Sequence, residues 1–99
     1  MGVIIDFSIF PMDGESAGLS PHVARALDII KRSGLAYSLG PMGTSIEGEW
    51  GEVMAVVDAC YRDLEQDFDR IYMNIKVDSR RDRTGGLTAK VRSVVDKQK

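Results

Sequence analysis

The sequence predicts an α+β fold in which two helices cover one face of a four-stranded antiparallel sheet. Three observations lead to this prediction: segments in which apolar and polar residues alternate, segments with apolar residues at helical spacing, and turn residues between them. Their order is βαββαβ, followed by a short C-terminal helix. This is the split βαβ pattern of a ferredoxin-like sandwich. With 99 residues, we expect one such domain over residues 1–99.

The strands are predicted from alternation with a period of two residues. In residues 3–10 and 70–79, one side of the strand is wholly apolar and the other is mixed. Two shorter strands are expected at 35–39 and 44–49, on either side of the turn at 40–43. We expect the apolar sides of the long strands to face the helices. We also expect the first and last strands to be neighbours at the centre of the sheet.

The helices are marked by capping residues and apolar stripes. Ser20, which is followed by proline, predicts the start of the first helix, and Gly34 predicts its end. The second helix is expected from Gly51, with an apolar stripe that continues to Phe68. A third, short amphipathic helix is expected around residues 87–95.

Composition and charge exclude several classes of function. The single cysteine allows neither an intramolecular disulfide nor a thiolate metal site. The N-terminus does not resemble a signal peptide and no apolar run is long enough to cross a membrane, so we expect a cytoplasmic protein without membrane partners. From residue 80 onward there are seven Lys/Arg and two Asp/Glu, whereas residues 1–79 have six and thirteen. Because the body is acidic, we expect a solvated basic tail and no nucleic-acid partner.

The sheet face opposite the helices is the candidate functional surface. It should combine the mixed sides of the first and last strands: Asp6, Ser8, Phe10, Tyr72, Asn74, Lys76 and Asp78. The third strand adds either Ser45, Glu47 and Glu49 or Thr44, Ile46 and Gly48, and the pattern does not choose between these sets. Such a face is either solvated or packed on a second subunit, or it binds a small polar or cationic ligand. The assembly interpretation and the ligand interpretation are compatible if the ligand lies between subunits.

The pattern gives no sign of catalysis. His22, the only histidine, is expected to be exposed in the first turn of its helix, and it has no apparent nucleophile as a partner. Cys60 lies on the apolar stripe of the second helix, which indicates a buried structural thiol. No metal-ligand cluster and no phosphate-binding loop is present in the sequence. We therefore expect no enzyme activity, no metal and no cofactor.

Four stretches carry a resemblance to a known family. They are Ser8–Pro11, Ser20–Val23, the segment PMGTSIEGEW at 41–50, and the segment IKVDSRRD at 75–82. In order and spacing they resemble the small thiamine-binding proteins that were long grouped as a domain of unknown function. The stretch PMGT-x-x-EG-x-W is the most specific of the four.

The resemblance implies a ferredoxin-like subunit that assembles through its sheets into a homo-oligomer, a dimer or a tetramer. It also implies thiamine, or its hydroxymethylpyrimidine portion, as the ligand. Thiamine has a cationic thiazolium ring and an aminopyrimidine with hydrogen-bond donors and acceptors. We expect a carboxylate at the cation, hydrogen-bonding groups at the pyrimidine and an apolar or aromatic wall. The expected ligand-binding residues are Ser8, Phe10, Met42, Thr44, Glu47 and Asn74.

Each of these residues also has a structural interpretation. Thr44 suits any strand, and Glu47 can form an ion pair with Lys76 across the sheet. Trp50 can either cover a ligand ring or pack under the second helix. The competing function is an interaction or regulatory module, whose open face serves only assembly. An RNA-binding role, based on Phe10 and Tyr72, ranks third.

Overall fold

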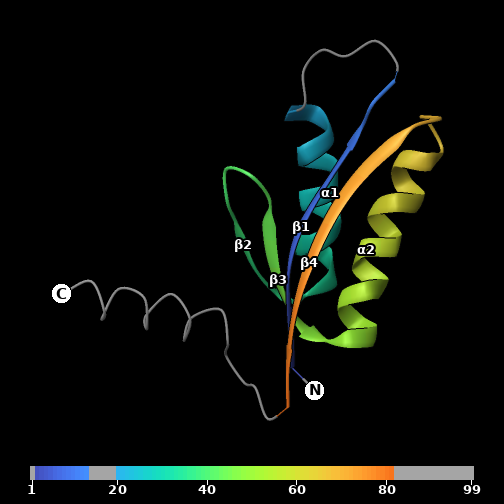
Figure 1. Ribbon diagram of the computed structural model, residues 1–99. Coiled ribbons are helices and arrows are strands. Elements are labelled where there is room, and N and C mark those ends of the chain that lie inside the picture. Colours follow the sequence, from blue (N-terminus) through green and yellow to red (C-terminus); the bar gives the residue numbers. More distant parts are fainter. Residues whose placement is uncertain (1, 14–19, 82–99) are drawn as a thin grey trace.

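The computed structural model describes residues 2–13 and 20–81 and has the predicted element order (Figure 1). The elements are β1 (Gly2–Pro11), α1 (Ser20–Ser33), β2 (Ala36–Leu39), β3 (Thr44–Glu49), α2 (Trp50–Glu65) and β4 (Ile71–Arg80). The expected third helix around residues 87–95 and most of the basic tail lie outside the described residues.

The sheet is four-stranded and antiparallel, with the order β2-β3-β1-β4. The prediction that β1 and β4 are neighbours is confirmed, but the prediction that both lie at the centre is wrong. β3 pairs with the other side of β1, so β1 and β3 are central and β4 is an edge strand. The physical reason is the split βαβ connection, in which each helical crossover skips one strand position that the other half of the chain fills.

The strand register decides which residues share a face. Ile5 lies opposite Ile46 on β3 and Val77 on β4, and all three project towards the helices. One step along, Phe7 lies opposite Thr44. The helix side of β3 is therefore the set Thr44, Ile46 and Gly48, and the open side is the set Ser45, Glu47 and Glu49.

The core lies between β1, β3 and the two helices, and its members share a fully or nearly fully buried side chain. They are Val3, Ile5, Phe7, Ile9, Ile30, Ile46, Val53, Val56, Val57, Cys60 and Leu64. The α2 stripe was predicted correctly, except that α2 ends at Glu65 and Phe68 packs against the core from the segment that follows. Gly34 ends α1 with φ +78°, a conformation that glycine adopts without strain.

A cluster of charges joins the two helices. Arg25 on α1 donates from Nε to Oδ2 of Asp63, at 3.0 Å, and from Nη2 to Oδ2 of Asp67, at 3.0 Å. These carboxylates raise the pKa of Arg25, chiefly through the hydrogen bonds. The cluster links α1 to α2 and to the segment that follows it, and α1 forms part of the site described below.

The helix-facing side of β4 is less covered than predicted. Met73 is 38% exposed and Val77 is 45% exposed, although both project from the same side of the sheet as the core residues of β1. The helices cover the centre of the sheet, and β4 lies beyond them at its edge. An apolar strip on β4 therefore remains accessible in the single chain.

Candidate functional site

A cavity lies where the sheet narrows. β3 begins at Thr44, opposite Phe7, whereas β1 continues to Pro11 and pairs there, within residues 2–13 and 20–81, with β4 alone. The cavity beyond the start of β3 has a volume of about 450 Å³, within the usual range for small-molecule sites. It is bounded by part of β1, the middle of α1, the β2–β3 turn and two residues of β4: Phe7, Ser8, Ile9, Phe10, Val23, Ala26, Ile30, Leu39, Gly40, Pro41, Met42, Gly43, Thr44, Tyr72 and Asn74.

The β2–β3 turn lies close to β1, and Gly43 makes this close approach possible. A Cβ atom on Gly43 would lie 3.0 Å from Oδ1 of Asp6 and 3.1 Å from the carbonyl oxygen of Phe7. The turn is also held by a hydrogen bond from the N–H of Gly40 to the carbonyl of Gly43, at 2.8 Å. Glycine at position 43 thus lets the hairpin approach β1 at the border of the cavity.

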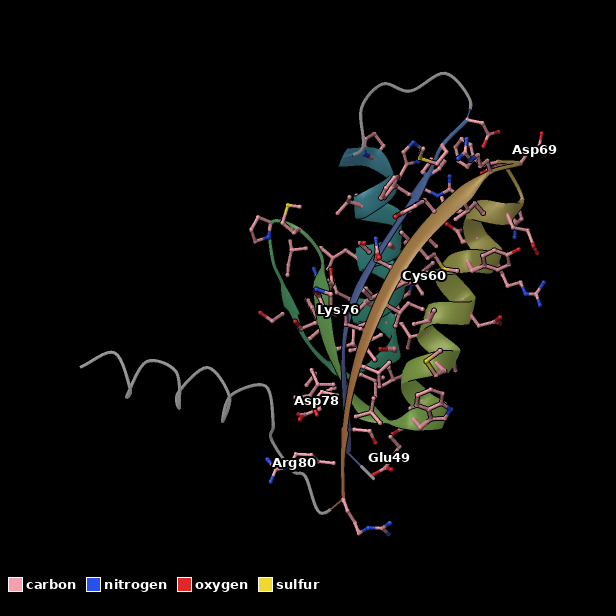
Figure 2. All side chains as sticks on the ribbon, viewed as in Figure 1. Glu49, Cys60, Asp69, Lys76, Asp78 and Arg80 are labelled. Atoms are coloured by element: carbon pink, nitrogen blue, oxygen red, sulfur yellow. The ribbon has the colours of Figure 1, made fainter. Side chains whose placement is uncertain are left out.

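One carboxylate holds together the end of the β1–β4 pair at which β1 finishes and β4 begins. Asp13 accepts hydrogen bonds from the backbone N–H groups of Asp69, at 3.0 Å, and Arg70, at 2.7 Å. Figure 2 shows Asp69 at this end of β4, while Asp78 and Arg80 lie towards the other end. The two strands that border the cavity are therefore held together at the point where the described sheet has no third strand.

Three polar side chains line a cavity that is otherwise mostly apolar. Ser8 and Asn74 face each other across β1 and β4, and Thr44 contributes a hydroxyl from the helix side of β3. Within residues 2–13 and 20–81, none of these three side chains has a hydrogen-bond partner. Their hydrogen-bonding capacity remains available to a bound molecule.

Thr44 reaches the same cavity as Ser8 and Asn74 although it lies on the opposite face of the sheet. The cavity lies at the end of β3, so it contacts side chains from both faces of the sheet. A strand end is a place where residues of opposite parity can converge. Only 7% of Thr44 is exposed, so a polar partner there would be largely shielded from water.

Aromatic and flexible apolar side chains complete the lining. The rings of Phe10 and Tyr72 are stacked with centroids 5.3 Å apart and planes at 29°. Met42, at the tip of the β2–β3 turn, is 88% exposed and has room to move. From α1, Val23 and Ala26 form an apolar wall.

Five of the six residues proposed from the sequence line this one cavity: Ser8, Phe10, Met42, Thr44 and Asn74. The sixth, Glu47, does not line it. Glu47 lies on the open face opposite Ile4, three positions along β3 from Thr44. Trp50 is 55% exposed at the start of α2 and does not line it either.

Sequence reasoning missed the contribution of α1 to the cavity. The helical spacing of Val23, Leu27 and Ile30 predicts that they form the apolar stripe of the first helix, but Val23 is exposed at the cavity wall. The available signal was its place near the start of α1. Asp6 was expected on the open face but not among the ligand-binding residues, and it lies close to the turn, with its Oδ1 3.0 Å from the position of a Cβ atom on Gly43.

His22 and Cys60 lie outside the cavity lining. The expectation that His22 is exposed is wrong, because its ring packs edge-on against Phe68, with centroids 5.2 Å apart, and its Nδ1 is buried, with no hydrogen-bond partner among the described residues. The expectation that Cys60 is a buried thiol is confirmed (Figure 2). Burial, and to a lesser extent the charge of Asp63, raises the pKa of this thiol to about 11, so it stays protonated and unreactive at neutral pH.

Among residues 2–13 and 20–81, no group of three His, Cys, Asp or Glu side chains is arranged to hold a metal ion. No helix in those residues combines the length and the apolar character needed to cross a membrane.

The sequence matches a model of one protein family. The family is described as "Thiamine-binding protein", and the match covers residues 5–95. A UPF0045 protein of Methanothermobacter thermautotrophicus is 35% identical over 97 residues, which is 96% of this chain and 98% of that protein. A UPF0045 protein of Mycobacterium bovis is 37% identical over 95 residues, which is 95% of this chain and 92% of that protein.

Solved structures with the same fold agree with this match. A hypothetical protein of Methanocaldococcus jannaschii superimposes with a TM-score of 0.84 at 27% identity, covering 94% of this chain and 95% of that one. A Thermotoga maritima protein, described as a candidate for thiamine biosynthesis or salvage, superimposes with a TM-score of 0.76 at 27% identity, covering 92% of this chain and 99% of that one. The predicted ferredoxin-like fold is thereby confirmed.

Proposed function

Because the chain belongs to the thiamine-binding protein family, we propose that it binds thiamine, or the hydroxymethylpyrimidine portion of thiamine, without catalysing a reaction. The observation that carries this proposal is the cavity beside β1. Ser8, Thr44 and Asn74 bring unengaged polar groups into an otherwise mostly apolar lining. Small-ligand sites typically have this composition, in which a few polar groups fix the orientation of the ligand.

The ligand chemistry matches the groups at hand. A hydroxyl both donates and accepts a hydrogen bond, and so does a side-chain amide, which suits the nitrogen atoms and amine of an aminopyrimidine. Phe10 and Tyr72 offer an aromatic surface at which a thiazolium cation gains on the order of 0.5–2 kcal/mol. Asp6 supplies a carboxylate at the border of the cavity, and Glu47 supplies a second one further along the open face.

We further propose that the protein works as a homo-oligomer in the cytoplasm. β4 is an edge strand, and its outer side has no strand partner among the described residues. Its partly exposed Met73 and Val77 make that edge apolar. Exposed apolar edges tend to pair with another chain. A second copy offers the same edge, so a two-fold symmetric contact would cover both.

The competing proposal is an interaction module in which the sheet serves assembly alone. The exposed edge of β4 favours assembly, but it does not explain three unengaged polar groups inside a cavity. The two proposals make different statements about small molecules, because only the first requires a bound ligand.

Native mass spectrometry with and without thiamine tests the proposal. We expect an oligomer that gains one thiamine mass per subunit. Thr44→Val and Asn74→Ala should each weaken binding, while Ser45→Ala, a polar-to-apolar change on the open face outside the cavity, should leave it unchanged. An oligomer that takes up neither thiamine nor its pyrimidine would favour assembly alone, and a ligand-free monomer would contradict both proposals.

A further inference from the structure

Beyond Phe7, β1 has no strand partner on its β3 side among the described residues, and Ile9, on this unpaired side, lines the cavity. In an antiparallel pair, a hydrogen-bonded residue directs both its N–H and its C=O towards the same neighbour, and the next residue directs them the other way. The N–H of Met12 donates to the carbonyl of Arg70, at 2.8 Å, continuing the β1–β4 register. By alternation, Ser8 and Phe10 also turn their backbone groups towards β4. Ile9 turns its N–H and C=O the opposite way.

A second observation gives the same result. The carbonyl oxygen of Phe7 lies 3.1 Å from the position of a Cβ atom on Gly43, so it faces the β3 side of β1. Ile9, two residues further along, shares this direction. β3 begins opposite Phe7, so no described strand residue stands across from Ile9. Pro11 faces the same side and has no N–H to donate.

Among the described strand residues, this edge therefore offers a single donor, the N–H of Ile9, next to the carbonyl of the same residue, and Pro11 adds only a further carbonyl. Another strand cannot extend along it, because Pro11 removes the next donor and the β2–β3 turn occupies the preceding position. A flat heteroaromatic ring can bind there if a ring nitrogen and an exocyclic amine stand side by side. The ring nitrogen would accept from the N–H of Ile9, and the amine would donate to its C=O.

We propose that the backbone of Ile9 recognises the aminopyrimidine edge of the ligand, as a strand would recognise the next strand. This inference rests on the proposed function and adds the atoms that select the ligand. A ring that continues the line of the sheet would place one face against Val23 and Ala26 of α1. Thr44 and Asn74 remain available for the other polar groups of the ligand.

Backbone recognition predicts selectivity by hydrogen-bond pattern rather than by size. An analogue of thiamine with a carbonyl oxygen in place of the exocyclic amine presents an acceptor to the C=O of Ile9 and a donor to its N–H. Both contacts become repulsive while the shape is kept. Leaving such shielded groups unpaired should weaken binding roughly 10- to 100-fold.

Amide hydrogen exchange in the ¹⁵N-labelled full chain, followed by NMR, tests the contact directly. In the free protein, the amide of Ile9 should exchange at least ~10-fold faster than that of Phe10, which pairs with β4. Saturating thiamine should slow exchange at Ile9 by ~10-fold or more and change that of Phe10 by less than about 2-fold. The amide of Phe10 is the internal control, because it lies in the same strand and borders the same cavity.

The outcomes separate this inference from the proposed function. One outcome is that thiamine binds and Thr44→Val lowers its affinity, while amide exchange at Ile9 is unchanged and the carbonyl analogue binds as well as thiamine. That outcome overturns only the inference about Ile9. If neither thiamine nor its pyrimidine binds, the proposed function and the inference both fall. Protection of Ile9 together with rejection of the carbonyl analogue supports both.

Discussion

The two halves of β1 differ in what lies beside them. From Val3 to Phe7 the strand has β3 on one side and β4 on the other, and its helix-facing side chains are buried. From Ser8 to Pro11, β4 is its only strand neighbour within the described part of the chain. The first half forms the centre of the core, whereas the second half adds Ile9 to the core and borders a cavity whose polar side chains have no hydrogen-bond partner among the described residues. The same strand thus supplies stability where it has two neighbours and a candidate binding site where it has one.

The largest expected effect is on stability, in the half with two neighbours. Ile5 is completely buried between Ile46 and Val77. Ile5→Ala should lower the free energy of unfolding by about 2–5 kcal/mol, because it removes buried methyl groups and leaves a void. Urea denaturation followed by circular dichroism measures this change. Ile9→Ala should cost less, because Ile9 already borders a cavity. An equal loss at both positions would contradict the distinction between the halves.

The second effect concerns the reactivity of Cys60, which reports how well the core excludes water. The thiol of Cys60 has a pKa of about 11 rather than 9.0, mainly because burial disfavours the thiolate. At pH 8 its alkylation should therefore be slower than that of a free thiol by about 100-fold or more, since each pKa unit is a factor of ten in thiolate population. Iodoacetamide labelling followed by mass spectrometry measures the rate. Labelling as fast as that of the unfolded chain would contradict a tightly closed core.

The raised pKa of Cys60 also predicts that stability falls as the pH rises above 9. The folded state holds the proton of Cys60 more tightly than the unfolded state does. The stabilising contribution is therefore complete below pH 9 and is lost as the pH rises towards about 11. Cys60→Ala should remove this contribution to the decline in the free energy of unfolding above pH 9.

A smaller effect is expected on ligand affinity, in the half with one neighbour. Ser8→Ala removes one hydroxyl from the cavity, and thiamine affinity should fall about 2- to 10-fold if that hydroxyl donates or accepts a hydrogen bond. Ser45→Ala removes a hydroxyl from the same sheet outside the cavity and is the matched control. Isothermal titration measures both. Equal thiamine affinities for the two variants would show that Ser8 does not contribute to binding.

The smallest effect concerns the helix that closes the cavity. Arg25→Met should lower the free energy of unfolding by less than about 1 kcal/mol, because the ion pairs with Asp63 and Asp67 are partly exposed. α1 also supplies Val23 and Ala26 to the cavity wall, so a small loss of thiamine affinity should accompany it. Thermal unfolding with and without thiamine measures both effects. Restored affinity in Arg25→Lys would indicate that charge, rather than packing, positions the helix.

The sequence determined the elements of this protein and most of the candidate site. Alternation and capping predicted the strands and helices of the described region, because side-chain periodicity and turn chemistry act over a few residues. Residue type and the resemblance together selected Ser8, Phe10, Met42, Thr44 and Asn74, which line one cavity. Membership of the family follows from the sequence as well.

The tertiary structure decided which of these residues meet. Strand order placed β4 at an edge, and register placed Glu47 outside the cavity, because both depend on pairings between distant segments. The early end of β3 opened the cavity and let Thr44 join residues from the opposite face. The role proposed for Ile9 depends on the direction of its backbone groups. Side-chain chemistry does not encode that direction, which follows only from the pairing of β1 with β3 and β4.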